Sequence, residues 1–287
     1  MKRRVEKTGL CKLTSTNGKF VKSHLIPRAL TPPREGGEPF PEFGMRRRPT
    51  RRLDSWYDDQ LVTQAGEDIL TALDTHAIEE FRRLKLVWQS FGPMVSLATK
   101  DFRRFPMTDN GIRIIRFQDP GRIRLFFLSL LWRAAATMRP EFSEVMLRAS
   151  ELRRVRAIVR DGNTDVPWGT YPVTLTQVTT RGAPHNHSPM YQVKAPFEVE
   201  GVRSKPLPMF RFYMDGLIAH IHLPVDDEIL DGLWPMVVGR DEPTAIGTVD
   251  WDGSWQRDNL ALTIADAEHE FPGAIERIDD SAGRKRK

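Results

Sequence analysis

The chain has 287 residues, of which 40% are hydrophobic and 28% are charged, and its formal net charge is +5. This length suits one large domain or two ordinary ones, and the composition excludes a disordered chain that lacks apolar side chains. A single cysteine, Cys11, excludes an intrachain disulfide bond and is typical of a reducing compartment. The basic N-terminus leads into no apolar signal-peptide core, so we expect a cytoplasmic protein.

The first fifty residues predict a β-hairpin followed by an irregular loop. Short β-prone runs flank the turn signal Thr16-Asn17-Gly18-Lys19, and the hairpin is expected to end near Pro27. The stretch from Thr31 to Thr50 holds five prolines and three glycines, which favour a loop. Loops of this length inside a domain are usually functional or disordered.

Three helices are expected in the next hundred residues. Between Asp59 and Trp88, apolar residues recur at spacings of three and four, which is typical of an amphipathic helix. The stretch from Leu125 to Met138 is apolar nearly all round, but Arg133 interrupts it and it is shorter than the roughly 20 residues that cross a bilayer. We therefore predict a buried helix and no membrane partner. A basic helix from about Ser150 to Arg160 follows and ends at Asp161-Gly162-Asn163.

Beyond Pro167 the pattern changes to short β-prone runs separated by glycine and proline, which predicts an antiparallel sheet. The chain is therefore predicted to have an α+β fold in three parts. These are an N-terminal module with a Pro- and Arg-rich loop over residues 1–90, a helical core over 91–162 and a β-rich region over 163–278. Residues 279–287 form a basic tail that we expect to be disordered.

The most informative motif is Lys22-Ser23-His24-Leu25-Ile26-Pro27-Arg28, which lies between Cys11 and the predicted loop and amphipathic helix. This order resembles that of HNH-type (ββα-metal) nucleases, in which a strand ends in a histidine and a helix beyond a loop supplies metal ligands. Ser23-His24-Leu25-Ile26-Pro27 is similar to the "SHIIP" pattern of a group of bacterial HNH-like proteins, which is often bracketed by two Cys-x-x-Cys pairs. The resemblance implies a degenerate ββα-metal module at the N-terminus.

The same resemblance implies that a zinc site has largely been lost. Cys11 occupies the first cysteine position, whereas Thr14, Thr63 and Gly66 stand where the other three cysteines would be. We therefore expect no structural zinc. Three further segments look similar to the same group: Trp56-Tyr57-Asp58, Glu67 and Phe126–Ala134.

The resemblance implies an HNH-like, metal-dependent endonuclease that cleaves phosphodiester bonds in DNA or RNA. His24 would be the general base that takes a proton from water, and a divalent cation such as Mg²⁺ or Mn²⁺ would stabilise the leaving 3′-oxygen. In most HNH enzymes an aspartate directly before the histidine binds the metal, but this chain has Ser23 there. Glu67, Asp58 and Asp59 are the candidate metal ligands that could compensate.

Nucleic acid is the expected partner because basic residues are concentrated in the predicted loop. Five arginines fall within seven residues and could contact phosphates: Arg46, Arg47, Arg48, Arg51 and Arg52. Such a cluster attracts polyanions through the release of counterions. The same pattern also fits solvated charge on a loop, and both interpretations stay open.

An alternative function also stays open. An imidazole at position 24 can equally hydrogen-bond a backbone carbonyl as a relic of the fold. The chain would then be a catalytically inactive HNH-like scaffold that binds nucleic acid or assembles with a protein partner subunit. In a third interpretation, the N-terminal module only braces a β-rich half that binds a protein partner.

Two His-x-His pairs and a group of tryptophans are weaker candidates. On a strand, residues i and i+2 share a face, so His185 with His187 or His220 with His222 could bind a transition metal. We interpret all four as surface histidines. Three tryptophans near the C-terminus could line a ligand groove, although packing in a core is the commoner role: Trp234, Trp251 and Trp255.

Overall fold

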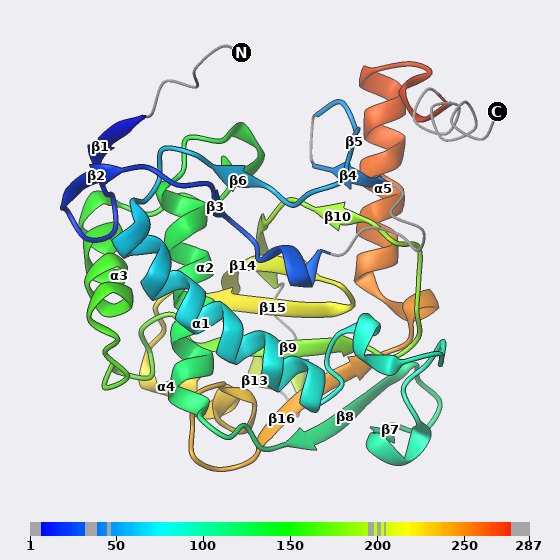
Figure 1. Ribbon diagram of the computed structural model, residues 1–287. Helices are drawn as coiled ribbons and strands as arrows, with labels where there is room; N and C mark the ends of the chain where they lie inside the picture. Colours follow the sequence, from blue (N-terminus) through cyan, green and yellow to red (C-terminus); the bar gives the residue numbers. More distant parts are fainter. Residues whose placement is uncertain are drawn as a thin grey trace.

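The computed structural model describes residues 7–31, 39–44, 47–194, 198–199, 202–203 and 205–276. Helices and a seven-stranded sheet combine within these ranges, which confirms the predicted mixture of α and β structure (Figure 1). Arg46 and the predicted tail at 279–287 lie outside the described residues. None of the helices in the described part of the chain is both long and apolar enough to traverse a lipid bilayer.

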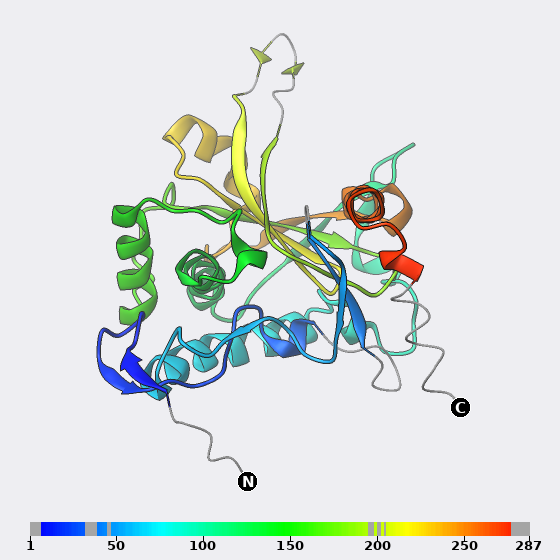
Figure 2. The ribbon, with the colours of Figure 1, turned by 90° about the horizontal axis from the view of Figure 1, so that it is seen from above.

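Three helices follow the periodicity of the sequence and lie on one side of the large sheet (Figure 2). They are α1 (Gln64–Arg83), α2 (Pro120–Ala136) and α3 (Ala149–Asp161). The carboxylate of Asp119 caps α2 by accepting a hydrogen bond from the Arg122 amide at 3.0 Å. Gly162, in the left-handed conformation with φ 61°, ends α3 as the sequence predicts.

The large sheet has the strand order β11-β14-β15-β9-β16-β8-β7. Its strands are β7 (Arg103–Arg104), β8 (Asn110–Ile115), β9 (Val173–Val178), β11 (Met190–Lys194), β14 (Leu207–Met214), β15 (Leu217–His222) and β16 (Thr244–Val249). Neighbouring strands are antiparallel except β9 and β16, which pair in parallel. The predicted antiparallel sheet thus contains one parallel pair, and β7 and β8 come from the segment that was predicted to be helical.

Side chains alternate between the two faces of this sheet. Apolar residues of β14 and β15, such as Phe212 and Ile221, join Phe126 and Phe127 of α2 in the main core. The opposite side of the sheet carries α5 (Trp255–Glu270), which lies away from α1, α2 and α3 (Figure 2). This helix was not among the elements predicted within the β-rich region over residues 163–278.

The N-terminal segment contains two short strand pairs. β1 (Thr8–Leu10) and β2 (Asn17–Lys19) form a hairpin whose turn spans residues 11–16. Asn17 and Gly18 lie in β2, so the predicted Asn-Gly turn is wrong. β3 (Ser23–His24) pairs with β6 (Tyr57–Asp58) in antiparallel fashion, and α1 begins shortly afterwards.

The predicted loop also contains strands that reach the second half of the chain. β4 (Phe40–Phe43) pairs with β5 (Thr50–Arg52) and, in parallel, with β10 (Asn186–His187). Trp56 packs edge to face against Phe142 with 5.7 Å between ring centroids. Further elements include β12 (Glu198–Val199), β13 (Val202–Arg203), α4 (Asp227–Leu233) and the 3₁₀-helices η1 (Arg28–Leu30), η6 (Trp234–Met236) and η7 (Trp251–Gly253).

Candidate functional site

His24 lies in β3 and pairs with Tyr57 of β6, the strand that precedes α1 in the chain. Its side chain is 25% exposed, so the ring is accessible from solvent. Nε2 of His24 lies 3.1 Å from Oδ1 of Asp54, which is within hydrogen-bonding distance. The chain therefore forms an accessible imidazole and carboxylate pair at the predicted histidine.

The carboxylate of Asp54 is shared among several donors. It pairs with Lys22, accepts a hydrogen bond from the Ser55 amide at 3.0 Å and lies 3.7 Å from Nε of Arg28. Burial raises the pKa of Asp54, but hydrogen bonds from Lys22 and His24 outweigh it and hold the pKa below its usual value. Asp54 is thus an ionised residue whose charge is already compensated by protein cations.

Arg133 of α2 forms a hydrogen bond with the backbone of the motif. Its guanidinium is only 1% exposed, and Nη1 donates to the carbonyl oxygen of His24 at 3.0 Å. The same nitrogen donates to Oδ2 of Asp74 at 3.0 Å. Since Asp74 belongs to α1, Arg133 ties β3, α1 and α2 together.

Glu67 is a predicted metal ligand that lies beside Ser23 of the motif. Burial raises its pKa, while the nearby Ser23 hydroxyl and the Arg133 guanidinium lower it in part. Ser23 itself is fully buried. Glu67 therefore lies on the interior side of β3, whereas the imidazole of His24 reaches solvent.

Asp58 and Asp59 are engaged elsewhere. Asp58 accepts hydrogen bonds from the amide of Gln60 at 2.8 Å and from the Thr137 hydroxyl at 2.7 Å. Asp59 forms an ion pair with Lys7 at 2.9 Å. Across the described ranges, no three His, Cys, Asp or Glu side chains come together in a group that could hold a metal ion. The carboxylates of Asp58 and Asp59 thus already have partners within the protein.

The four positions that resemble zinc cysteines converge in space. The Cys11 sulfur accepts a hydrogen bond from the Thr14 amide at 3.4 Å, and a β-carbon on Gly66 would lie 2.8 Å from it. Burial raises the pKa of the Cys11 thiol, but hydrogen bonds with Thr14 and Thr63 outweigh it and lower the pKa. Residues 14, 63 and 66 therefore surround the buried Cys11 sulfur, and Thr14 and Thr63 form hydrogen bonds with it.

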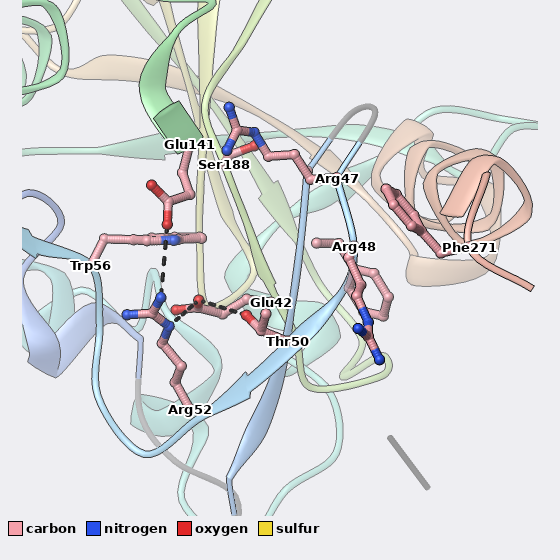
Figure 3. Close-up of a pocket in the computed structure, with 11 residues that line it drawn as sticks. Glu42, Arg47, Arg48, Thr50, Arg52, Trp56, Glu141, Ser188 and Phe271 are labelled. Carbon is pink, nitrogen blue, oxygen red and sulfur yellow. Dashed lines mark hydrogen bonds and ion pairs between the residues drawn. The ribbon is translucent and has the colours of Figure 1, made fainter. Parts of the chain in front are cut away.

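Two arginines of the predicted cluster form ion pairs or hydrogen bonds within the protein. Nε of Arg52 lies 3.0 Å from Oε2 of Glu42, and Nη2 of Arg51 donates to the Pro39 carbonyl at 3.0 Å. Arg47 and Arg48 line a cavity of about 280 Å³, in which they point away from each other (Figure 3). Within the described part of this cluster, Arg47 and Arg48 are the better candidates for phosphate contacts.

The buried carboxyl of Glu42 is a further feature of this cavity that sequence reasoning missed. Its side chain is 5% exposed, and Oε1 has no hydrogen-bond partner among the described residues. Burial raises the pKa of Glu42 to about 7, against the opposing effect of Arg52. Glu42 stands between Pro41 and Phe43 in the middle strand of a three-stranded sheet, where it pairs with Thr50 of β5 and Asn186 of β10.

The two His-x-His pairs are not surface groups, which corrects the sequence interpretation. His185, His187 and His222 are all buried, and His220 is partly buried. Burial lowers the pKa of His187 to about 4 and that of His222 to about 4, so both are neutral at physiological pH. The alternation in β15 does place His220 and His222 on one face of the sheet, as the sequence indicates.

Asp54, Asp74 and Arg133 are the site residues that sequence reasoning missed. Asp54 could have been found, because it stands just before the Trp56-Tyr57-Asp58 segment and an acidic residue there falls near β6. Asp74 and Arg133 carry no local signal, since their contact joins two separate helices. No family model, curated protein or solved structure matches this chain.

Proposed function

We propose that this chain is a catalytically inactive HNH-like scaffold that binds nucleic acid. What supports the HNH-like part is the order of β3, a long loop, β6 and α1, with His24 on the first strand. The observation that carries the proposal is the convergence of Thr14, Thr63 and Gly66 on the Cys11 sulfur. The resemblance would require these positions to lie close together, although residues 11 and 14 are far from residues 63 and 66 in the sequence.

The loss of turnover is inferred from the donors around His24. A cation that stabilises a leaving oxygen needs several carboxylate or imidazole ligands with free lone pairs. Asp54 is bound by Lys22 and the Ser55 amide, and Glu67 is half-buried with its Oε2 atom enclosed. These groups stabilise the fold around the motif rather than leave a set of ligands open to solvent.

The binding part rests on the cations beside His24. Lys22 and Arg28 are 46% and 62% exposed, and together they face the single carboxylate of Asp54. This leaves an excess of positive charge beside Asp54, and Arg48 is a further exposed arginine in the segment between β4 and β5. Exposed lysine and arginine side chains bind phosphates through counterion release, which weakens as salt is added.

The test of binding is fluorescence anisotropy with labelled single-stranded DNA, RNA and duplex DNA at 50 and 200 mM salt. We expect binding that weakens with salt, and at least a tenfold loss in a Lys22→Ala, Arg28→Ala double variant. Arg257→Ala, which removes an exposed arginine on α5, is the matched control and should bind normally. Failure of the wild-type protein to bind any of these probes would reject the proposal.

Cleavage by His24 is a second candidate, favoured by the 3.1 Å contact between its imidazole and the Asp54 carboxylate. A carboxylate in this position can orient an imidazole that acts as a general base. The protein should be incubated with plasmid DNA and with RNA in the presence of Mg²⁺ or Mn²⁺. Scaffold function predicts intact substrates, whereas cleavage that His24→Ala abolishes would establish the nuclease instead.

A further inference from the structure

A second cavity lies on the face of the large sheet that points away from α2. It has a volume of about 420 Å³ and is formed by β9, β11, β14, β15 and β16 together with residues of α4, η6 and the start of α5. Pockets for small ligands usually fall between about 300 and 1,000 Å³. The proposed function does not involve this cavity, and none of the strands and helices that form it contains His24.

The polar floor of the cavity follows from strand register. Arg211 of β14 pairs with His220 of β15, and His220 pairs with Thr174 of β9. Directly paired residues in antiparallel strands project from the same face, so these three side chains form one row across the sheet. His222 extends the polar surface two residues further along β15.

Arg211 is the unusual member of this row. Its side chain is 3% exposed, yet Nη2 has no hydrogen-bond partner among the residues that the structure describes. Burial lowers the pKa of Arg211 to about 10, so the guanidinium still carries its charge at neutral pH. A buried cation without an opposite charge is unfavourable, and a bound anion would relieve that cost.

The rest of the lining contains donors and apolar surface but no carboxylate among the described side chains. Nε2 of His222 lies 2.9 Å from the Thr174 hydroxyl, and its buried Nδ1 has no hydrogen-bond partner within the described ranges. Apolar walls come from residues such as Met209, Ile218 and Trp255. An occupant therefore needs one negative group for the floor and an apolar body for the walls.

We propose that this cavity binds a small organic anion with an apolar body, such as a medium-chain carboxylate, whose charged group pairs with Arg211. The wall residue Trp255 is 70% exposed and stands at the edge of the cavity, where it would cover the apolar part of the ligand. Arginine suits this role because its planar guanidinium presents two parallel donors to a carboxylate.

The test is isothermal titration calorimetry on the full chain with three probes of matched chemistry. Octanoate supplies both features, octanamide has the same body without charge, and inorganic phosphate has charge without the body. We expect saturable binding of octanoate, at least tenfold weaker binding of octanamide and no binding of phosphate. Arg211→Gln should weaken octanoate binding at least tenfold, while Arg257→Ala should leave it unchanged.

A steric variant keeps the test decisive if Arg211→Gln fails to fold. Gly247 of β16 lines the cavity, and a β-carbon there would meet its nearest atom, the Thr176 hydroxyl oxygen, at an ordinary 3.5 Å. Gly247→Leu should therefore fold and fill the cavity, which would abolish octanoate binding. The proposal is overturned if octanoate fails to bind, if phosphate binds in its place, or if octanoate still binds to Gly247→Leu.

Discussion

Nη1 of Arg133 donates to the backbone carbonyl of His24 at 3.0 Å, from a side chain that is 1% exposed. The most recognisable motif of the sequence is thus held in place by a charge in the central helix. The guanidinium depends in turn on Asp74 for its own compensation. This arrangement makes the conformation of β3 sensitive to a residue on α1.

Asp74→Ala should destabilise the protein markedly. Removing one partner of a buried ion pair leaves the other charge uncompensated, so we expect the free energy of unfolding to fall by about 3 kcal/mol. Urea denaturation followed by tryptophan fluorescence measures this change. Asp161→Ala, which removes the partner of the surface residue Arg160, should have little effect. Equal stability of both variants would show that Arg133 does not need its counter-ion.

Restoring the three missing cysteines should create a zinc site. In a Thr14→Cys, Thr63→Cys, Gly66→Cys variant, four thiols surround one point, and structural zinc prefers such a tetrahedral set. We expect one zinc per chain by elemental analysis and a higher melting temperature that EDTA reverses. The wild-type chain, purified with the same zinc, is the control. A triple variant that folds but takes up no zinc would mean that these positions are not arranged as ligands.

Acid should destabilise the fold through its buried histidines. His187 has a pKa of about 4 in the folded chain, against 6.5 as its ordinary value. Below pH 6.5 His187 therefore takes up a proton in the unfolded chain but stays neutral in the folded chain. The free energy of unfolding falls as the pH falls toward 4. Between pH 7 and pH 5 this costs about 2 kcal/mol for one such group. His187→Gln should lose less stability over that interval than wild type, as measured by urea denaturation at each pH.

Glu42 should act in the opposite direction. Its pKa is about 7 in the folded chain, above the ordinary 4.5, so the folded state keeps a proton that the unfolded chain releases. Stability from this group is complete below pH 4.5 and is lost as the pH rises to 7, by up to about 3 kcal/mol. In Glu42→Gln that loss should disappear, which the difference in unfolding free energy between pH 5 and pH 7 reports. Glu242→Gln at the surface should keep the wild-type dependence.

Helix α1 was predictable from its hydrophobic periodicity, whereas α5 was not. In α1 the buried residues Leu70, Leu73, Ala77 and Phe81 repeat at the spacing of a helix that covers a core. The buried side of α5 is Gln256, Leu260, Thr263 and Ala267, which has the same spacing but is half polar. Hydrophobic periodicity cannot detect such a helix, because its polar residues are buried against histidines of another segment.

The candidate site was predictable only where its residues lie close together in the sequence. The motif around His24 and the four positions around Cys11 could be named from short spacings. The partners that decide the chemistry come from elsewhere: Asp54 across the strand pair, and Arg133 and Asp74 from two helices. Long-range contacts of this kind leave no periodic trace in one sequence, so the prediction of Asp58 and Asp59 as metal ligands rested on their place near the start of the expected helix.

The parallel pairing of β4 with β10 sets the order in which the chain can mature during translation. Glu42 and Phe43 leave the ribosome long before Asn186 and His187, their partners in that ladder. The edge of β4 that pairs with β10 therefore stays unpaired while the intervening residues are synthesised. Contacts between residues so far apart in the sequence form late in folding. We expect a nascent chain that ends before β10 to remain sensitive to protease around residues 40–52.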